Sequence, residues 1–140
     1  MTRADFRALR ERVGHSQQSL ADALGVSVRA VKKWEHESGW DAPDDAWELL
    51  EAALDTQRRM CDCVLDTAHE QAVSLGDVPC IAMTYYRDQA MFDEFGRDAG
   101  YFGVANASSR AAAMLLEREG YDVEMRYPVE DAIPTPGSGY

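Results

Sequence analysis

Apolar residues recur every three or four positions through most of the first half of the chain, which is the spacing of one helix face. This spacing predicts a first helix over about 2–13, with Phe6 and Val13 on its apolar face. The same pattern returns over 43–75, interrupted by a polar gap at 56–59. One long helix and two helices joined by a hinge both fit this second stretch.

Two short helices are predicted between the first helix and the long helical stretch. Ser16 and Ser27 can each accept hydrogen bonds from the free N–H groups of a following helical turn. Gly25 lies between the two helices and can adopt the left-handed conformation that ends a helix. On the second helix the apolar positions are Ala30, Val31 and Trp34, and the opposite face carries Val28, Arg29, Lys32 and Lys33. The exposed face is therefore expected to be cationic.

Two strands are predicted in the second half of the chain. Residues 78–86 are a mostly apolar run of strand length, which predicts a buried strand. Residues 121–127 alternate apolar and polar side chains, which predicts a strand with one solvated face. A two-stranded sheet is marginal alone, so we expect helices across one face, continuation of the sheet in a second subunit, or both.

Helical signals separate these strands. Residues 87–99 are helical or irregular, and a helix is predicted over 111–119 with Asn106 or Ser108 as its cap. The expected fold class is thus mostly α with a small α/β part. We expect an N-terminal domain of four to five helices, a long helix, and a small α+β domain with two strands. The expected domains are 1–57, 58–128 and an extended tail at 129–140.

The charge of the chain is divided unevenly between its halves. The net charge is -11, but residues 1–42 carry seven Lys and Arg against six Asp and Glu. The acidity belongs to residues 43–140, which carry seven basic and 19 acidic residues. If the first half binds a polyanion, the second half is expected to face away from it, and the affinity of one subunit should be modest.

The first half resembles the lambda repressor/Cro-type helix-turn-helix domain over roughly residues 3–54. The matching positions are Leu9, Arg10, Gly14, Ser16, Gln17, Leu20, Ala21, Leu24, Gly25, Val26, Ser27, Val31, Trp34 and Glu35. The resemblance implies a DNA-binding domain whose second short helix lies in the major groove of double-stranded DNA.

Carried over position by position, the resemblance implies phosphate contacts at Gln17 and Gln18. It implies contacts with base edges and flanking phosphates at Ser27, Val28, Arg29, Lys32 and Lys33. Arg10 and Glu35 stand where the family has a partly buried structural ion pair. The loop after Glu35 is longer than is usual in the family.

Other candidate chemistry is sparse. Tyr85, Tyr86, Arg87 and Asp88 lie at and just after the end of the first predicted strand, where a ligand or partner site can lie. An aromatic core with a paired Arg and Asp is the simpler interpretation of this cluster. No phosphate-binding loop, nucleophile elbow or zinc-protease motif is present, so we expect no enzyme activity and no metal or cofactor. The three cysteines are expected to be reduced thiols in a cytoplasmic protein without a membrane segment.

Three functional hypotheses follow from these patterns. The leading one is a sequence-specific transcriptional regulator, a repressor that binds an inverted-repeat operator as a homodimer. The alternative makes the acidic second half a protein-interaction module, such as an antitoxin that neutralises a partner and autoregulates through the first half. A third is a regulator that senses an effector near Tyr86 and Arg87.

Overall fold

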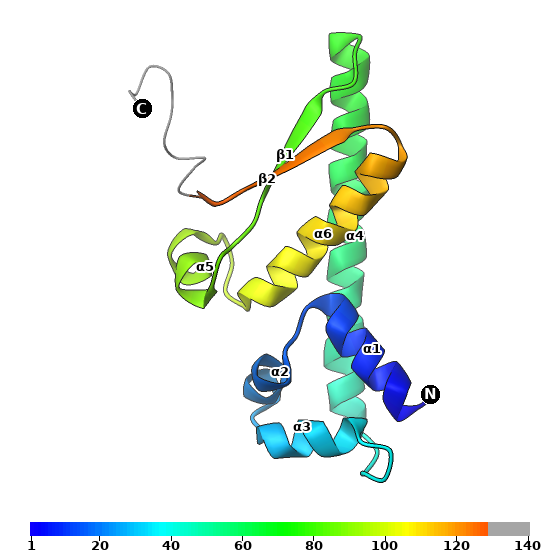
Figure 1. Cartoon of the computed structure of the whole chain (residues 1–140), viewed down its shortest axis with the longest axis vertical. Coiled ribbons are helices and arrows are strands. Elements are labelled where there is room, and N and C mark those ends of the chain that lie inside the picture. Colours follow the sequence, from blue (N-terminus) through cyan, green and yellow to red (C-terminus); the bar gives the residue numbers. More distant parts are fainter. Residues whose placement is uncertain (129–140) are drawn as a thin grey trace. The chain divides into compact units, whose positions relative to one another are not determined.

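The computed structural model describes residues 1–128, so the tail predicted at 129–140 lies outside the described residues. The chain forms two compact units, Met1–Arg58 and Arg59–Tyr140, called unit 1 and unit 2 below. The described part is mostly helical with one two-stranded sheet, which confirms the expected fold class (Figure 1). No helix within these 128 residues combines the length and the apolar character needed to cross a membrane.

Unit 1 consists of three short helices and the first part of a long one. These are α1 (Arg3–Val13), α2 (Gln17–Leu24), α3 (Val28–Glu35) and α4 (Asp44–Leu75). The Ser16 hydroxyl accepts a hydrogen bond from the backbone N–H of Ser19, and the Ser27 hydroxyl accepts one from that of Ala30. Gly25 ends α2 with φ 71°, in the left-handed region. The predicted caps and glycine turn are therefore present.

The core of unit 1 forms where α1, α3 and α4 meet around Phe6. The Phe6 ring lies edge-on to Trp47, with centroids 5.0 Å apart, and to Trp34 at 6.1 Å. The other buried apolar residues of this core are Val13, Leu20, Ala21, Val31, Ala46 and Leu50. Val26 in the turn after α2 is exposed and does not fill the core.

Helix α4 is continuous through the polar gap at 56–59, so the single-helix alternative is the one observed. Gln57 in this gap is buried, and its Nε2 donates to the carbonyl oxygen of Arg12 at 3.0 Å. That carbonyl lies in the last turn of α1, where helix carbonyls lack an intrahelical partner. The polar gap is thus a hydrogen-bonded contact between two helices of unit 1.

Unit 2 is built on a parallel strand pair. Its elements are the end of α4, β1 (Cys80–Thr84), α5 (Gln89–Phe95), α6 (Phe102–Arg118) and β2 (Asp122–Arg126). Ile81 pairs with Val123 and Met83 with Met125. Two parallel strands must be joined by a long crossover connection, and here α5 and α6 form the connection between β1 and β2. Met83, Leu116 and Tyr121 lie in the core of this unit together with Cys61 and Ala68 from α4.

The prediction that the first strand is buried was wrong. Within β1, Met83 is buried, Ile81 and Thr84 are half-buried, and Cys80 and Ala82 are exposed. The reason is that the sheet is covered on one face only. Helix α6 contacts the strands, and the described residues place no second layer on the opposite face (Figure 1).

The predicted start of the last helix was also wrong, because α6 begins at Phe102 and not near residue 111. Asn106 is buried inside this helix and does not cap it. Its Oδ1 accepts from the Tyr86 N–H at 2.8 Å, and its Nδ2 donates to the Tyr86 carbonyl at 2.7 Å. Ser109 similarly donates to the Thr84 carbonyl at 3.0 Å. The buried polar side chains of Asn106 and Ser109 thus form hydrogen bonds with the backbone at the end of β1 and just after it, which allows them to lie inside the helix.

Candidate nucleic-acid interface

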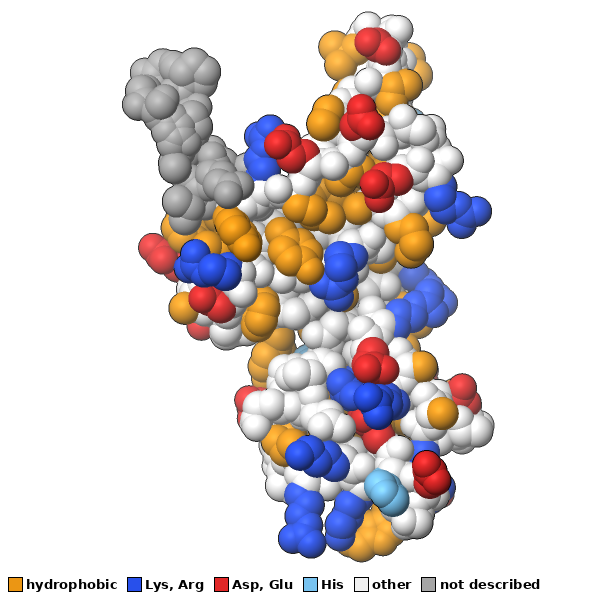
Figure 2. Space-filling view, viewed as in Figure 1, with side chains coloured by type: hydrophobic (Ala, Val, Ile, Leu, Met, Phe, Trp, Pro, Cys, Tyr) orange, Lys and Arg blue, Asp and Glu red, His pale blue; other side chains and the backbone are white. Residues whose placement is uncertain are grey.

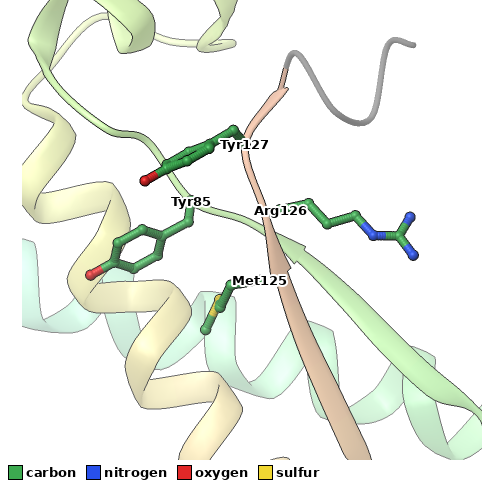
Figure 3. Close-up of a pocket in the computed structure, with 4 residues that line it drawn as sticks. All are labelled: Tyr85, Met125, Arg126 and Tyr127. Atoms are coloured by element: carbon green, nitrogen blue, oxygen red, sulfur yellow. The ribbon is translucent and has the colours of Figure 1, made fainter. Parts of the chain in front are cut away.

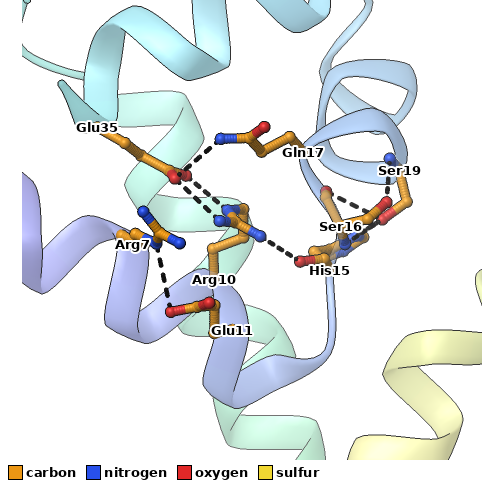
Figure 4. A network of polar contacts seen from close by, with 8 residues as sticks. All are labelled: Arg7, Arg10, Glu11, His15, Ser16, Gln17, Ser19 and Glu35. Carbon is orange, nitrogen blue, oxygen red and sulfur yellow. Dashed lines mark hydrogen bonds and ion pairs between the residues drawn. The ribbon is translucent and has the colours of Figure 1, made fainter.

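A buried ion pair joins α1 to α3 (Figure 4). Arg10 donates from Nε to Glu35 Oε2 at 2.5 Å and from Nη2 to Oε1 at 2.9 Å, which is the two-pronged geometry of a strong arginine–carboxylate pair. Arg10 also donates from Nη1 to the His15 carbonyl at 2.9 Å. The side chains of Arg10 and Glu35 are 8% and 4% exposed. The pair therefore holds α3 and the start of α2 against α1.

His15 is buried beside this ion pair. Its Nδ1 lies 2.7 Å from the hydroxyl of Ser19, and burial, together with the nearby Arg10 guanidinium, lowers the pKa of His15 from 6.5 to about 4. The imidazole is therefore neutral at neutral pH. Its role in unit 1 is to fill the junction between α1 and α2.

Acidification is expected to destabilise the protein through His15. Below pH 6.5 the His15 imidazole binds a proton in the unfolded state, whereas in the folded state it stays neutral until about pH 4. The free energy of unfolding therefore falls as the pH is lowered across this range. The expected loss is about 2 kcal/mol between pH 7 and 5. Urea unfolding followed by tryptophan fluorescence at both pH values measures it.

The matched comparison is between His15→Gln, which should lose this pH dependence, and His36→Gln. His36 is exposed and bonds to Ser38 in the loop after α3, so its replacement should leave the dependence intact. An unchanged slope in His15→Gln would assign the effect to other groups.

The solvent-facing side of α3 is cationic. Arg29 and Lys32 are exposed, and the exposed Ser27 caps the N-terminus of the helix. Figure 2 shows Lys and Arg side chains gathered over the end of unit 1 that carries α3 in Figure 1. Val28 departs from the predicted arrangement, because it is half-buried and packs partly on the core of unit 1. A part of its side chain remains at the surface.

Lys33 is paired with a tryptophan that sequence reasoning missed. The Nζ of Lys33 lies 4.1 Å from the ring centroid of Trp40, a cation–π distance, and the Trp40 side chain is 65% exposed. Trp40 follows α3 in the loop that is longer than is usual. In the sequence Trp40 is a single aromatic residue after the cationic helix, and no periodic pattern of residues distinguishes it.

The loop that carries Trp40 is held from two sides. Arg3 Nη2 donates to the Gly39 carbonyl at 2.8 Å and lies 3.1 Å from Asp41 Oδ1. A Cβ on Gly39 would lie 1.7 Å from the backbone oxygen of Lys33, so only glycine allows this approach to the end of α3. Trp40 thus stands at a defined place beside Lys33.

A protein-family model described as Helix-turn-helix matches residues 6–53. Residues 6–53 form a helix-turn-helix domain of the Cro/C1 type. The match confirms the resemblance and covers most of α1, all of α2 and α3, and the first part of α4. A search of curated proteins found no match for the chain. The chain is thus, in general terms, a DNA-binding regulator of transcription, with α3 as the second helix of the helix-turn-helix motif.

The two glutamines that begin α2 of the helix-turn-helix domain differ in their surroundings. Gln17 is half-buried and donates from Nε2 to Glu35 Oε1 at 3.2 Å, so it belongs to the ion-pair network in Figure 4. Gln18 is exposed and donates to Asp22 Oδ1 at 2.8 Å. The structure therefore brings Gln17 together with Arg10 and Glu35, whereas Gln18 stands at the surface.

The four residues proposed as an effector or partner site outside the helix-turn-helix domain each make a contact within unit 2. Asp88 caps α5, and the hydrogen bond from the Met91 N–H, with Arg87 adjacent, lowers the pKa of its carboxyl. The Tyr86 ring packs edge-on against Phe92, and the Tyr85 hydroxyl accepts from Arg110 at 2.6 Å. These contacts account for the cluster as part of the fold.

A pocket of about 230 Å³ lies at the end of the strand pair, lined by Tyr85, Met125, Arg126 and Tyr127 (Figure 3). Of the four proposed residues, Tyr85 alone lines it. Within residues 1–128 no three His, Cys, Asp or Glu side chains are placed to hold a metal ion. Burial raises the pKa of the Cys61 thiol, and Cys63 and Cys80 are exposed free thiols.

Proposed function

We propose that the chain is a sequence-specific transcriptional repressor that binds an inverted-repeat operator in double-stranded DNA as a homodimer. The observation that carries the proposal is the cationic, solvent-facing side of α3 in a helix-turn-helix domain whose α3 is anchored by the Arg10–Glu35 pair. In this class of motif the equivalent helix enters the major groove and its side chains contact base edges.

The proposal gives the residues of this surface roles that follow from their chemistry. Arg29 can donate two parallel hydrogen bonds to O6 and N7 of a guanine. The half-buried Val28 presents a methyl group to thymine, and Lys32 and Lys33 neutralise phosphates on either side of the groove. Ser27, Gln17 and Gln18 stand at helix starts, where backbone N–H groups also favour phosphate oxygens.

The charge distribution supports a homodimer. Residues 1–42 have nearly balanced charge and residues 43–140 are strongly acidic, so one subunit has little electrostatic attraction for DNA. Two domains bound to two half-sites combine their affinities, which is how a motif of this class acts on an inverted repeat.

Replacing Arg29 and Lys32 by alanine should have different effects on DNA binding. Arg29→Ala is expected to cost about 1–3 kcal/mol on an operator selected from random duplexes, and to relax base preference at one position in each half-site. Lys32→Ala should weaken binding to all sequences similarly and reduce the salt dependence by about one phosphate contact per subunit. Fluorescence anisotropy over a range of salt concentrations measures both.

The control is Arg58→Ala, which removes an exposed cation on α4 that belongs neither to α2 or α3 nor to the Trp40 loop. Its affinity and salt dependence should match those of the wild type. Unchanged operator binding by a triple variant with alanine at Arg29, Lys32 and Lys33 would refute the proposed interface.

A second candidate function rests on the acidity of residues 43–140, which carry 19 Asp and Glu. In this alternative, unit 2 binds a basic protein partner, as an antitoxin binds a toxin, and the helix-turn-helix domain autoregulates the pair. Stoichiometric co-purification of a basic protein encoded beside this chain would favour it. A full-length chain that forms only homodimers favours the first candidate.

A further inference from the structure

Strand β2 presents its outer edge without a partner strand among residues 1–128. The Tyr85 N–H donates to the Arg126 carbonyl at 2.9 Å, so the backbone of Arg126 faces β1. Main-chain groups alternate between the two edges along a strand. Glu124 therefore also faces β1, whereas the N–H and carbonyl groups of Val123 and Met125 point outward. This outer edge is a template for another strand.

The side chains of β2 divide into an apolar and a charged face. In Figure 3 Met125, Tyr85 and Tyr127 lie on one side of the sheet and Arg126 points to the other. Met125 and Tyr127 are 37% and 39% exposed although they lie on the apolar side. On the charged side, the Arg126 guanidinium lies 2.7 Å from Glu124 of the same strand.

We propose that β2 pairs antiparallel with β2 of a second copy, around a twofold axis through Met125. In this register Glu124 of each chain lies opposite Arg126 of the other, and Val123 lies opposite Tyr127. The inference rests on the homodimer of the proposed function and assigns its interface. It gives a four-stranded sheet in which the exposed apolar side chains of the two β2 strands cover one another.

The backbone geometry agrees with this register. Opposed residues whose main-chain groups point outward exchange hydrogen bonds, and this applies to the two copies of Met125. The Glu124–Arg126 pairs then fall at the positions between these hydrogen bonds, where opposed side chains approach most closely. The guanidinium has five N–H donors, so Arg126 can bind across the interface while retaining its contact with Glu124 of its own chain.

Other registers centred on a residue of β2 bring like charges together. An axis at Asp122, Glu124 or Arg126 places that residue opposite its own copy. An axis at Val123 places Asp122 opposite Glu124. Registers centred between two residues place apolar side chains opposite polar ones. The Met125 register pairs opposite charges, and β1 has no charged residue to specify an alternative at the other edge.

Charge reversal at each position tests the interface. Glu124→Arg alone and Arg126→Glu alone each place like charges opposite one another twice in a homodimer, so each should raise the dissociation constant at least tenfold. An equimolar mixture of the two variants should dimerise with an affinity near that of the wild type, since one chain is then positive at both positions and the other negative. Sedimentation with one variant fluorescently labelled measures the mixed pair.

The mixture separates the cross-chain contact from the ion pair within β2, because that internal pair is broken in both variants and stays broken when they are mixed. Glu70→Arg makes the same charge change on the exposed side of α4 and should leave dimerisation unchanged. A chain carrying both Glu124→Arg and Arg126→Glu restores every pair and should dimerise like the wild type.

Four results would overturn the proposal. Single variants that dimerise like the wild type, or a mixture that stays monomeric, would remove β2 from the interface while leaving the homodimer of the proposed function standing. A double variant that stays monomeric would exclude the charge pairing. A wild-type chain that is monomeric both in solution and on its operator would overturn the homodimer itself, and this inference with it.

Discussion

Replacing Arg10 by methionine is expected to destabilise unit 1 by about 3–5 kcal/mol. The change leaves the Glu35 carboxylate buried without its two hydrogen bonds from Arg10, so that of these three bonds only the one from Gln17 remains. It also removes the donor to the His15 carbonyl. The three tryptophans, Trp34, Trp40 and Trp47, all lie in unit 1, so urea unfolding followed by tryptophan fluorescence measures this unit.

The control for Arg10 is Arg7→Ala on the same helix. Arg7 and Glu11 form an exposed pair at 3.5 Å, and its loss should cost less than about 1 kcal/mol. Replacing Arg10 and Glu35 together by methionine should cost less than Arg10→Met alone, because no buried charge is then left unpaired. An Arg10→Met chain as stable as the Arg7→Ala chain would contradict the anchoring role assigned to the pair.

Replacing Leu116 by alanine is expected to destabilise unit 2 by about 2–5 kcal/mol. Leu116 is fully buried in the core between α4, α6 and the strands, so truncation leaves a cavity. The described tyrosines all lie in unit 2, and near-UV circular dichroism of tyrosine follows this unit while tryptophan fluorescence follows unit 1. We expect the tyrosine signal to be lost at lower urea concentration, with a smaller change in the tryptophan transition.

Met114→Ala is the matched control, since Met114 lies on the same helix and is exposed. It should leave both transitions nearly unchanged. If Leu116→Ala lowered operator affinity while the tryptophan transition held, the loss would be traced to the assembly that unit 2 is proposed to make. Equal shifts of both transitions would instead show that the two units unfold as one.

The elements of unit 1 were predictable because their signals are local. The hydroxyl of Ser16 or Ser27 needs a backbone N–H three residues away, and Gly25 needs a conformation of its own backbone. The cationic face of α3 follows likewise from helical spacing alone. Trp40 was not predictable, because its place depends on Arg3 holding a loop 36 residues further along the chain.

The long helix α4 and the elements of unit 2 were less predictable, because polar residues in them bind partners far away in the chain. Asn106 has the side chain of a helix cap, but it bonds to the backbone of Tyr86, 20 residues earlier. Gln57 interrupts the apolar pattern of α4, and its partner carbonyl at Arg12 lies 45 residues away. In both cases a polar residue that locally suggests a helix boundary lies inside a continuous helix.

The sequence by itself determined the helix-turn-helix domain, the cationic face of α3 and the presence of two strands, because periodicity and capping act within a few residues. The tertiary structure decided that α4 is one helix, that α6 starts at Phe102, and that the strands pair in parallel, with β1 as the only partner strand of β2 among residues 1–128. These features depend on hydrogen bonds and packing between residues far apart in the chain, which local patterns do not encode.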